Sequence, residues 1–132
     1  LYRMLYSQGV ALEAIGLAPR TNPSATQAFE SDPRRVWQRF ADHFHLFRGT
    51  PSWIWFNHVL VEVFGFTQPF GSRTADASYD VIDSALRRPE FLPRALFERF
   101  GIEVLATTES PLDDLAHHRK LAESGWKGRV IT

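Results

Sequence analysis

The residues best suited to chemistry lie between positions 107 and 114, where hydroxyl and carboxyl side chains follow an apolar run. The apolar run itself, residues 102–107, is short, partly β-branched and bounded by glycine and proline, which predicts a buried strand. In α/β proteins, ligands bind at the carboxyl ends of such strands. Thr108 and Glu109 would present polar groups at that end, so we predict that both lie in a substrate site.

The same stretch also has a purely structural interpretation, because its polar residues suit the start of a helix. Ser110 precedes a proline and would be the N-cap of a helix over 111–124, with Asp113 in its first turn. The N-terminus of such a helix would also favour a bound anion. From the residues alone the two interpretations are equally good, and Asp113 is kept as a supporting site residue.

Two pairs of histidines are the other candidates for chemistry. His43 and His45 form a His-x-His pair of the kind that binds zinc in many barrel hydrolases. We expect this pair on a helix, where residues two apart point about 200° away from each other and cannot easily share a metal. The pattern therefore favours an amphipathic helix surface, and we predict no metal ligand in this sequence.

The second pair, His117 and His118, lies on the helix expected over 111–124. Asp113 and Asp114 each lie four residues earlier, so both histidines are placed for ordinary pairs along the helix surface. Because this helix follows directly after a strand end, His117 is also a candidate for contact with a substrate or with the residues that bind it.

The composition excludes several classes of protein. Fifteen Lys and Arg balance fifteen Asp and Glu, so no net charge attracts nucleic acid or an anionic membrane. The absence of cysteine excludes a disulfide scaffold and is compatible with the cytoplasm. No apolar run approaches the roughly 20 residues that span a bilayer. With 44% hydrophobic and 14% aromatic residues the chain can bury a core, and we expect a soluble cytoplasmic protein.

The positions of proline and glycine predict a mainly helical chain. Proline follows Asp32, Thr50 and Ser110, and a proline after such a capping residue is typical of a first helical turn. Apolar residues recur at helical spacing within the longer segments. We expect helices over residues 1–8, 10–16, 33–48, 51–64, 76–88, 93–100 and 111–124, with loops over 17–32 and 67–75.

A strand over 102–107, a helix, and a second strand over 129–132 form the pattern of a βαβ unit. Two strands do not make a stable sheet by themselves, so we expect the other strands in polypeptide outside this sequence. Leu1 is not an initiator residue, and both ends fall within expected elements. The sequence thus predicts a segment of a larger protein that lacks a complete active site of its own.

A family resemblance follows from four segments. Residues 107–118, TTESPLDDLAHH, resemble the Thr-Thr-Asp-Asp-Pro-x-Asp-Asp-Leu-x-x-His motif of uronate isomerases. Residues 93–105 resemble that family's helix leading into its second barrel strand, and residues 51–66 resemble its Asn-Pro-x-x-x-Trp helix. Residues 3–10 resemble its opening Arg-x-Met-Arg-x-x-Gly-Val. The matches keep the same order and cover almost the whole chain.

The resemblance implies an enzyme that isomerises hexuronates, D-glucuronate to D-fructuronate and D-galacturonate to D-tagaturonate, by moving a proton between C2 and C1. It implies a distorted (β/α)8 barrel of the amidohydrolase type, with a large helical insertion after the first strand. Residues 1–100 would be that insertion, an irregular helical bundle. Residues 101–132 would be the attached strand–helix–strand edge of the barrel.

The resemblance also implies which parts of the active site this sequence lacks. The family's metal-binding His-x-His and a His-Tyr pair would precede Leu1, and an Arg and the Asp that moves the proton would follow Thr132. We therefore expect residues 1–132 to be inactive alone and to hold no cofactor, with zinc a candidate metal of the parent enzyme. Arg3 would support the site. The implied partners are a hexuronate, the rest of the barrel and further copies in a homo-oligomer, with no nucleic acid and no membrane.

Two departures from the family's motifs indicate a divergent branch. Its Asp-Asp before Pro is here Glu109-Ser110, and its Trp-Thr-His-Leu-Glu run is here residues 55–59, WFNHV. Two other functions stay open from the residues alone. One is a helical interaction module whose aromatic face binds a partner helix. The other is a barrel hydrolase, because one scaffold supports both reactions.

Overall fold

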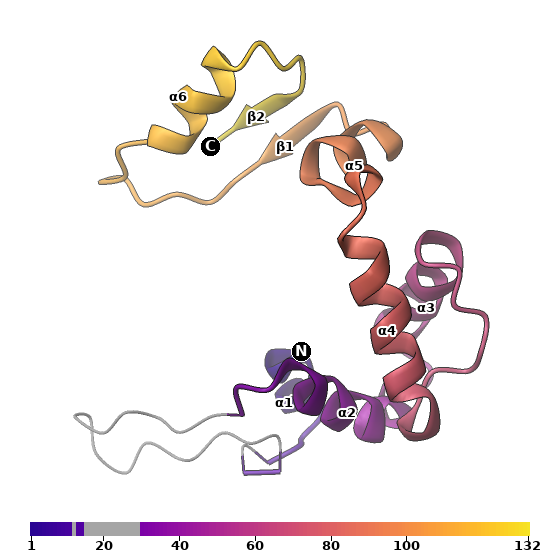
Figure 1. Ribbon diagram of the computed structural model, residues 1–132. Coiled ribbons are helices and arrows are strands. Elements are labelled where there is room, and N and C mark those ends of the chain that lie inside the picture. The colour runs from indigo at the N-terminus through magenta and orange to yellow at the C-terminus, as the bar shows by residue number, and fades with distance from the viewer. Residues whose placement is uncertain (12, 15–29) are drawn as a thin grey trace. The chain divides into compact units, whose positions relative to one another are not determined.

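The computed structural model describes residues 1–11, 13–14 and 30–132, so the expected helix over 10–16 and the loop over 17–32 lie mostly outside the described residues. The chain divides into two compact units, unit 1 from Leu1 to Ala85 and unit 2 from Leu86 to Thr132. Unit 1 is built from helices, whereas unit 2 combines helices with two strands (Figure 1). This confirms the prediction of a mainly helical chain with a small β element.

The described part of unit 1 contains four α-helices joined by short helical turns of other types. They are α1 (Tyr2–Ser7), α2 (Pro33–His43), the 3-10 turn η1 (Phe44–Phe47), α3 (Pro51–His58), the π-helical turn η2 (Val59–Val63), the 3-10 turn η3 (Ser72–Thr74) and α4 (Ala75–Leu86). The expected helices over 1–8, 33–48, 51–64 and 76–88 are confirmed in position. The two longer ones, however, change helix type in their second half.

Side-chain caps fix where α2 and α3 begin. The Asp32 carboxylate accepts the main-chain N–H of Arg34 at 2.9 Å, and the Thr50 hydroxyl accepts that of Trp53 at 3.3 Å. A proline follows each cap, at a position whose N–H would have no partner in the helix. After α3 the chain widens into η2, where three of five residues are valine, and such β-branched side chains crowd an ordinary α-helix.

The core of unit 1 is a cluster of aromatic rings from α2, η1, α3 and the segment before η3. Phe40 is completely buried, and its ring centroid lies 5.1 Å from that of Phe56 and 5.7 Å from that of Phe44. Trp53 stacks on Phe44 at 4.5 Å. Aromatic pairs at these distances add attraction beyond the area they bury. The buried cluster consists of Leu5, Val10, Phe40, Ala41, Phe44, Phe47, Phe56, Leu60, Phe66, Phe70 and Ala75.

A buried polar contact attaches α4 to α2. The indole Nε1 of Trp37 donates to the Ala75 carbonyl at 3.1 Å and to the Ser78 hydroxyl at 3.0 Å. Ser78 is completely buried, and its hydroxyl donates in turn to the same carbonyl at 2.8 Å. A buried hydroxyl costs free energy unless it is hydrogen-bonded, so this arrangement fixes one orientation of α4.

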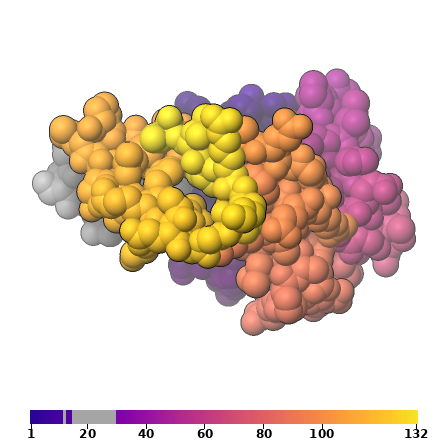
Figure 2. Space-filling model, turned by 90° about the horizontal axis from the view of Figure 1, so that it is seen from above, coloured from indigo at the N-terminus to yellow at the C-terminus, as the bar shows by residue number. Residues whose placement is uncertain are grey.

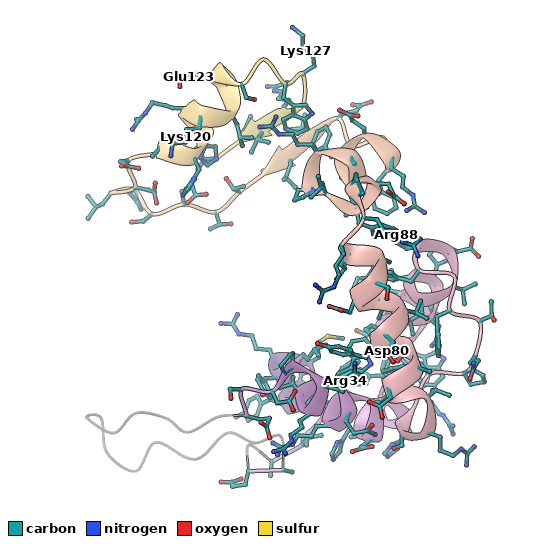
Figure 3. The ribbon with its side chains drawn as sticks, in the orientation of Figure 1. Arg34, Asp80, Arg88, Lys120, Glu123 and Lys127 are labelled. Carbon is teal, nitrogen blue, oxygen red and sulfur yellow. The ribbon has the colours of Figure 1, made fainter. Side chains whose placement is uncertain are left out.

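An exposed ion pair joins the same two helices at the surface. Arg34 of α2 contacts Asp76 at 3.2 Å and Asp80 at 2.5 Å, and Figure 3 shows Arg34 and Asp80 facing each other from the two helices. The hydrogen bonds that Arg34 donates to Asp80 and Asp76 raise its pKa above the ordinary value, so the guanidinium stays charged. All three side chains are largely exposed, and such pairs add little stability in water.

Unit 2 contains a parallel strand–helix–strand unit. Its elements are η4 (Pro89–Phe91), α5 (Pro93–Arg99), β1 (Val104–Ala106), α6 (Ala116–Glu123) and β2 (Arg129–Ile131). The two strands pair in parallel, with Leu105 opposite Val130. The predicted βαβ order is confirmed. The helix expected over 111–124 is wrong at its start, because α6 begins at Ala116.

The boundary between the compact units lies before α5, earlier than the predicted division between residues 100 and 101. The reason is that α5 packs on unit 2: the ring of Phe97 lies 4.9 Å from that of Trp126 in an edge-on contact. The Trp126 indole N–H also donates to the Glu98 carboxylate at 3.1 Å. The predicted domains, 1–100 and 101–132, concern the parent protein and stay a prediction.

Within the residues that the structure describes, no helix combines the length and apolar character that a membrane crossing requires.

Candidate functional site

The carboxyl end of β1 is held by three contacts around one threonine. The main-chain N–H of Thr107 donates to the Ile131 carbonyl at 2.8 Å and continues the strand pairing one residue beyond β1. The Thr107 hydroxyl lies 3.2 Å from the same carbonyl and 2.9 Å from Nε2 of His118. Thr107 therefore ties the end of β1 to β2 and to the first turn of α6.

The segment between β1 and α6 forms a loop that three polar side chains stabilise internally. Ser110 Oγ accepts the main-chain N–H of Leu112 at 3.3 Å. Oδ1 of Asp113 accepts that of Leu115, and Oδ1 of Asp114 accepts that of Ala116, both at 2.8 Å. Short polar side chains that bond the backbone two residues ahead compete with helix formation. This competition explains why the helix does not start at the proline after Ser110, so Ser110 is not its N-cap.

The start of α6 is unusual in its backbone. Leu115, the residue before the helix, has a φ of 53°, in the left-handed region that residues other than glycine seldom adopt. The Asp113 side chain holds this conformation by accepting the Leu115 N–H. The role of Asp113 that the structure describes is thus to shape the loop, and its carboxylate remains exposed.

The other predicted site residues fall into two groups. Thr108 and Glu109 directly follow the tied end of β1, with Thr108 exposed and Glu109 half-buried. His117 lies exposed in the first turn of α6. Arg3 belongs to unit 1, where it lies exposed on α1. The structure thus groups Thr108, Glu109, Asp113 and His117 on or beside one loop of unit 2, and it holds Arg3 in the other unit.

The hydrogen bond between Thr107 and His118 was not predicted from the sequence. We expected His118 to pair with Asp114 along a helix, but Asp114 precedes α6 and accepts a main-chain N–H, while His118 contacts Thr107. The only available signal was the motif resemblance, in which the final histidine lies eleven residues after the first threonine. Neither helical nor strand spacing relates two such positions.

His43 and His45, the His-x-His pair, both form hydrogen bonds to the backbone of their own segment. Nδ1 of His43 lies 2.8 Å from the Arg39 carbonyl, and Nδ1 of His45 lies 3.1 Å from that of Asp42. A carbonyl can only accept, so both rings donate to the backbone of their own segment. Among the described residues no group of three or more His, Cys, Asp or Glu side chains is placed to hold a metal ion. The described residues therefore do not assemble a metal site by themselves, and the expectation that this sequence holds no metal ligand stays a prediction.

The sheet has one face toward α6 and one open face. Thr107 contacts His118 of α6, and Leu105 lies two residues earlier on the same face, opposite Val130, so Val130 also points toward α6. Side chains alternate along a strand, which places Val104 and Ile131 on the opposite face. These two are 41% and 40% exposed, so the buried strand expected at 102–107 is wrong for the chain by itself. The space-filling view shows the C-terminal residues, in yellow, at the surface beside the orange residues of unit 2 (Figure 2).

Taken together, unit 2 is a parallel strand–helix–strand segment of the α/β type, with hydroxyl and carboxyl side chains after its first strand, at the position where ligands bind in α/β proteins. The chain belongs to the glucuronate isomerase family, whose model matches residues 24–131.

Known proteins resemble the chain over its whole length. It is 57% identical to a uronate isomerase of Phenylobacterium zucineum and 52% identical to one of Mesorhizobium japonicum, with all 132 residues aligned in each case. The glucuronate isomerase of Caulobacter crescentus, solved by crystallography, matches at 53% identity with a TM-score of 0.81, over 100% of this chain and 26% of that one. The uronate isomerase structure from Thermotoga maritima matches at 26% identity with a TM-score of 0.69, over 97% of this chain and 25% of that one. The chain spans about a quarter of the length of the curated relatives it matches.

Proposed function

We propose that the chain is part of an aldose–ketose isomerase that interconverts hexuronates, D-glucuronate with D-fructuronate and D-galacturonate with D-tagaturonate. The membership in the glucuronate isomerase family supports the reaction class. The observation that carries the proposal is the end of β1, where Thr108 and Glu109 follow a strand whose open face carries apolar side chains. An apolar open face is what a strand inside a closed barrel would bury.

The proposed reaction moves hydrogen within one substrate and needs no external oxidant. A base removes the proton from C2 of the aldose, and an acid delivers a proton to C1. The C1 carbonyl becomes a hydroxyl while the C2 hydroxyl becomes a carbonyl, so C1 is reduced as C2 is oxidised. Such a step needs an acid–base pair that works near neutral pH and donors for the developing oxyanion. Those groups, and any zinc ion, would lie in the remainder of the parent.

Within this reaction the residues of the chain would bind and orient the sugar. Thr108 would hydrogen-bond a sugar hydroxyl, and the Glu109 carboxylate would accept from another. Asp113 would hold the loop in the shape that its bond to Leu115 favours, with His117 beside it. Arg3 would support the site. Residues 1–132 alone would then be inactive.

The remaining parts of the proposal concern the parent. Residues 1–100 would be a helical insertion and residues 101–132 the edge of a (β/α)8 barrel of the amidohydrolase type. The parent would be a homo-oligomer. We place it in the cytoplasm, because a chain without cysteine suits a reducing compartment.

The test is an assay of the full-length parent on D-glucuronate and D-galacturonate, following ketose formation. Isomerisation of either sugar supports the proposal, whereas hydrolysis of an ester or amide with no ketose formed would replace it with the hydrolase function. Glu109→Gln should lower kcat/KM at least tenfold, because the neutral amide is a weaker acceptor than the carboxylate. Glu103→Gln is the matched control, since Glu103 is exposed at the opposite end of β1. Equal rates for the two variants would remove Glu109 from the site.

A further inference from the structure

One side-chain hydrogen bond closes the loop that carries most of the predicted site. The bond joins Thr107, at the last paired position of β1, to His118 in the first turn of α6, eleven residues later. Between these two residues lie Thr108, Glu109, Asp113 and His117, which are four of the five site residues predicted from the sequence. The loop between them is therefore fixed at its base by a bond that none of the four contributes to.

A count of hydrogens indicates which way the bond runs. The Thr107 hydroxyl has a single hydrogen, and it lies 3.2 Å from the Ile131 carbonyl, which can only accept. If the hydroxyl donates to that carbonyl, it must accept from the imidazole. Nε2 of His118 is then the donor, at 2.9 Å from the hydroxyl oxygen. In that arrangement the ring carries its proton on Nε2.

The same bond fixes the rotation of the strand end. Thr107 points toward α6, because its hydroxyl contacts a side chain of that helix. Successive side chains of an extended chain point to opposite faces, so Thr108 is directed to the face that carries Val104 and Ile131. That open face is the one that would line the interior of a barrel. Without the bond between Thr107 and His118, Thr108 would be free to turn away from this open face.

We propose that His118 is a positioning residue that, by donating Nε2–H to Thr107, closes the loop over residues 108–117 and directs Thr108 toward the substrate. The role deepens the function proposed above and rests on it. His118 itself touches neither the sugar nor the reacting atoms. Its contribution is to reduce the number of conformations of the loop before the substrate arrives, which lowers the cost of binding in the productive geometry.

Two amide substitutions at His118 test the assignment of the donor. In His118→Gln the amide nitrogen can reach the place of Nε2, whereas in His118→Asn the shorter side chain mimics the Nδ1 position. In the full-length parent we expect Asn to lower kcat/KM for the hexuronate about tenfold, as loss of one ordinary hydrogen bond allows. The His118→Gln variant should keep a kcat/KM within about twofold of that of the unaltered parent. Lys120→Gln, an exposed change on the same helix, should have no effect.

The partner residue supplies the second arm. Thr107→Val removes the hydroxyl but keeps the branched shape, and Thr107→Ser keeps the hydroxyl. Thr107→Val should lower kcat/KM by the same factor of about ten, whereas Thr107→Ser should change it little. The double variant Thr107→Val with His118→Asn should lower kcat/KM no more than either single change. Independent, multiplying losses would overturn the proposal, because two residues that act through one bond cannot be removed twice. Equal losses for Gln and Asn would overturn it as well.

Hydrogen exchange separates this inference from the proposed function. Peptides covering residues 104–117 of the full-length parent should exchange faster in His118→Asn and Thr107→Val than in the original or in His118→Gln. Unchanged exchange in the Asn and Val variants refutes the loop closure whatever the activity. If the unaltered parent converts no hexuronate, the proposed function fails while the exchange data still decide whether His118 closes the loop. If one of the two disruptive variants, His118→Asn or Thr107→Val, does not fold, the other is used in its place, because each removes the same bond.

Discussion

Replacing Phe40 by alanine should cost unit 1 a large part of its stability. The Phe40 side chain is completely buried, and five other aromatic rings lie with their centroids between 5.1 and 6.1 Å from its own. Removing a buried phenylalanine ring costs about 3–5 kcal/mol, because the surrounding rings cannot all move to fill the space. A domain of ordinary stability has about 5–15 kcal/mol in total. The variant should therefore unfold at a clearly lower denaturant concentration than the original chain.

The assay is urea unfolding of the 132-residue chain, followed by tryptophan fluorescence. Trp37 and Trp53 both contact the aromatic cluster, so their emission reports its opening. With a denaturant slope near 2 kcal/mol per molar, a cost of about 4 kcal/mol lowers the urea midpoint by about 2 M. Phe40→Leu keeps most of the volume and should cost less than about 1.5 kcal/mol.

The matched control is Ile54→Ala, because Ile54 lies on α3 in the same unit and is 70% exposed. It should change the free energy of unfolding by no more than about 0.5 kcal/mol. The reasoning is refuted if Phe40→Ala and Ile54→Ala have the same midpoint, since the aromatic cluster would then not be the core.

Three smaller predictions use the same chain. Asp32→Ala should lower the free energy of unfolding of unit 1 by about 1 kcal/mol, because the N–H of Arg34 loses its acceptor; an unchanged urea midpoint would contradict this. Gly128→Ala should shift the near-ultraviolet circular dichroism, because an added Cβ would lie 2.2 Å from ring atoms of Trp126 and would push the indole off Phe97; a superimposable spectrum would speak against it. The amides of Val104 and Leu105 should exchange faster than those of Phe40 and Ala41, because the strand is exposed while the helix is buried; strong protection of the strand would reverse that view.

Local signals were sufficient to predict where most helices begin. Asp32 and Thr50 are followed by proline, and both caps form as the sequence indicates. Capping depends only on residues two or three apart, so it can be read without knowledge of the fold. The order of strand, helix and strand in unit 2 was predictable for the same reason, since it rests on short apolar runs between glycine and proline.

Contacts between distant positions could not be predicted. The segment 111–115 has the composition of a first helical turn, yet the side chains of Asp113 and Asp114 bond the backbone ahead of them and delay the helix. Whether such a side chain caps a helix or replaces one is decided by small energy differences. The bond between Thr107 and His118 depends on how α6 lies against the strand end, which no local spacing fixes.

The open face of β1 and β2 has a consequence for how the protein is made. Among the described residues, the buried cluster of unit 1 lies between Leu5 and Ala75, so it can condense during synthesis before the strands have left the ribosome. The strands then emerge with apolar side chains such as Val104 and Ile131 exposed. In the proposed parent these side chains would be prone to aggregation until the rest of the barrel is synthesised and covers them.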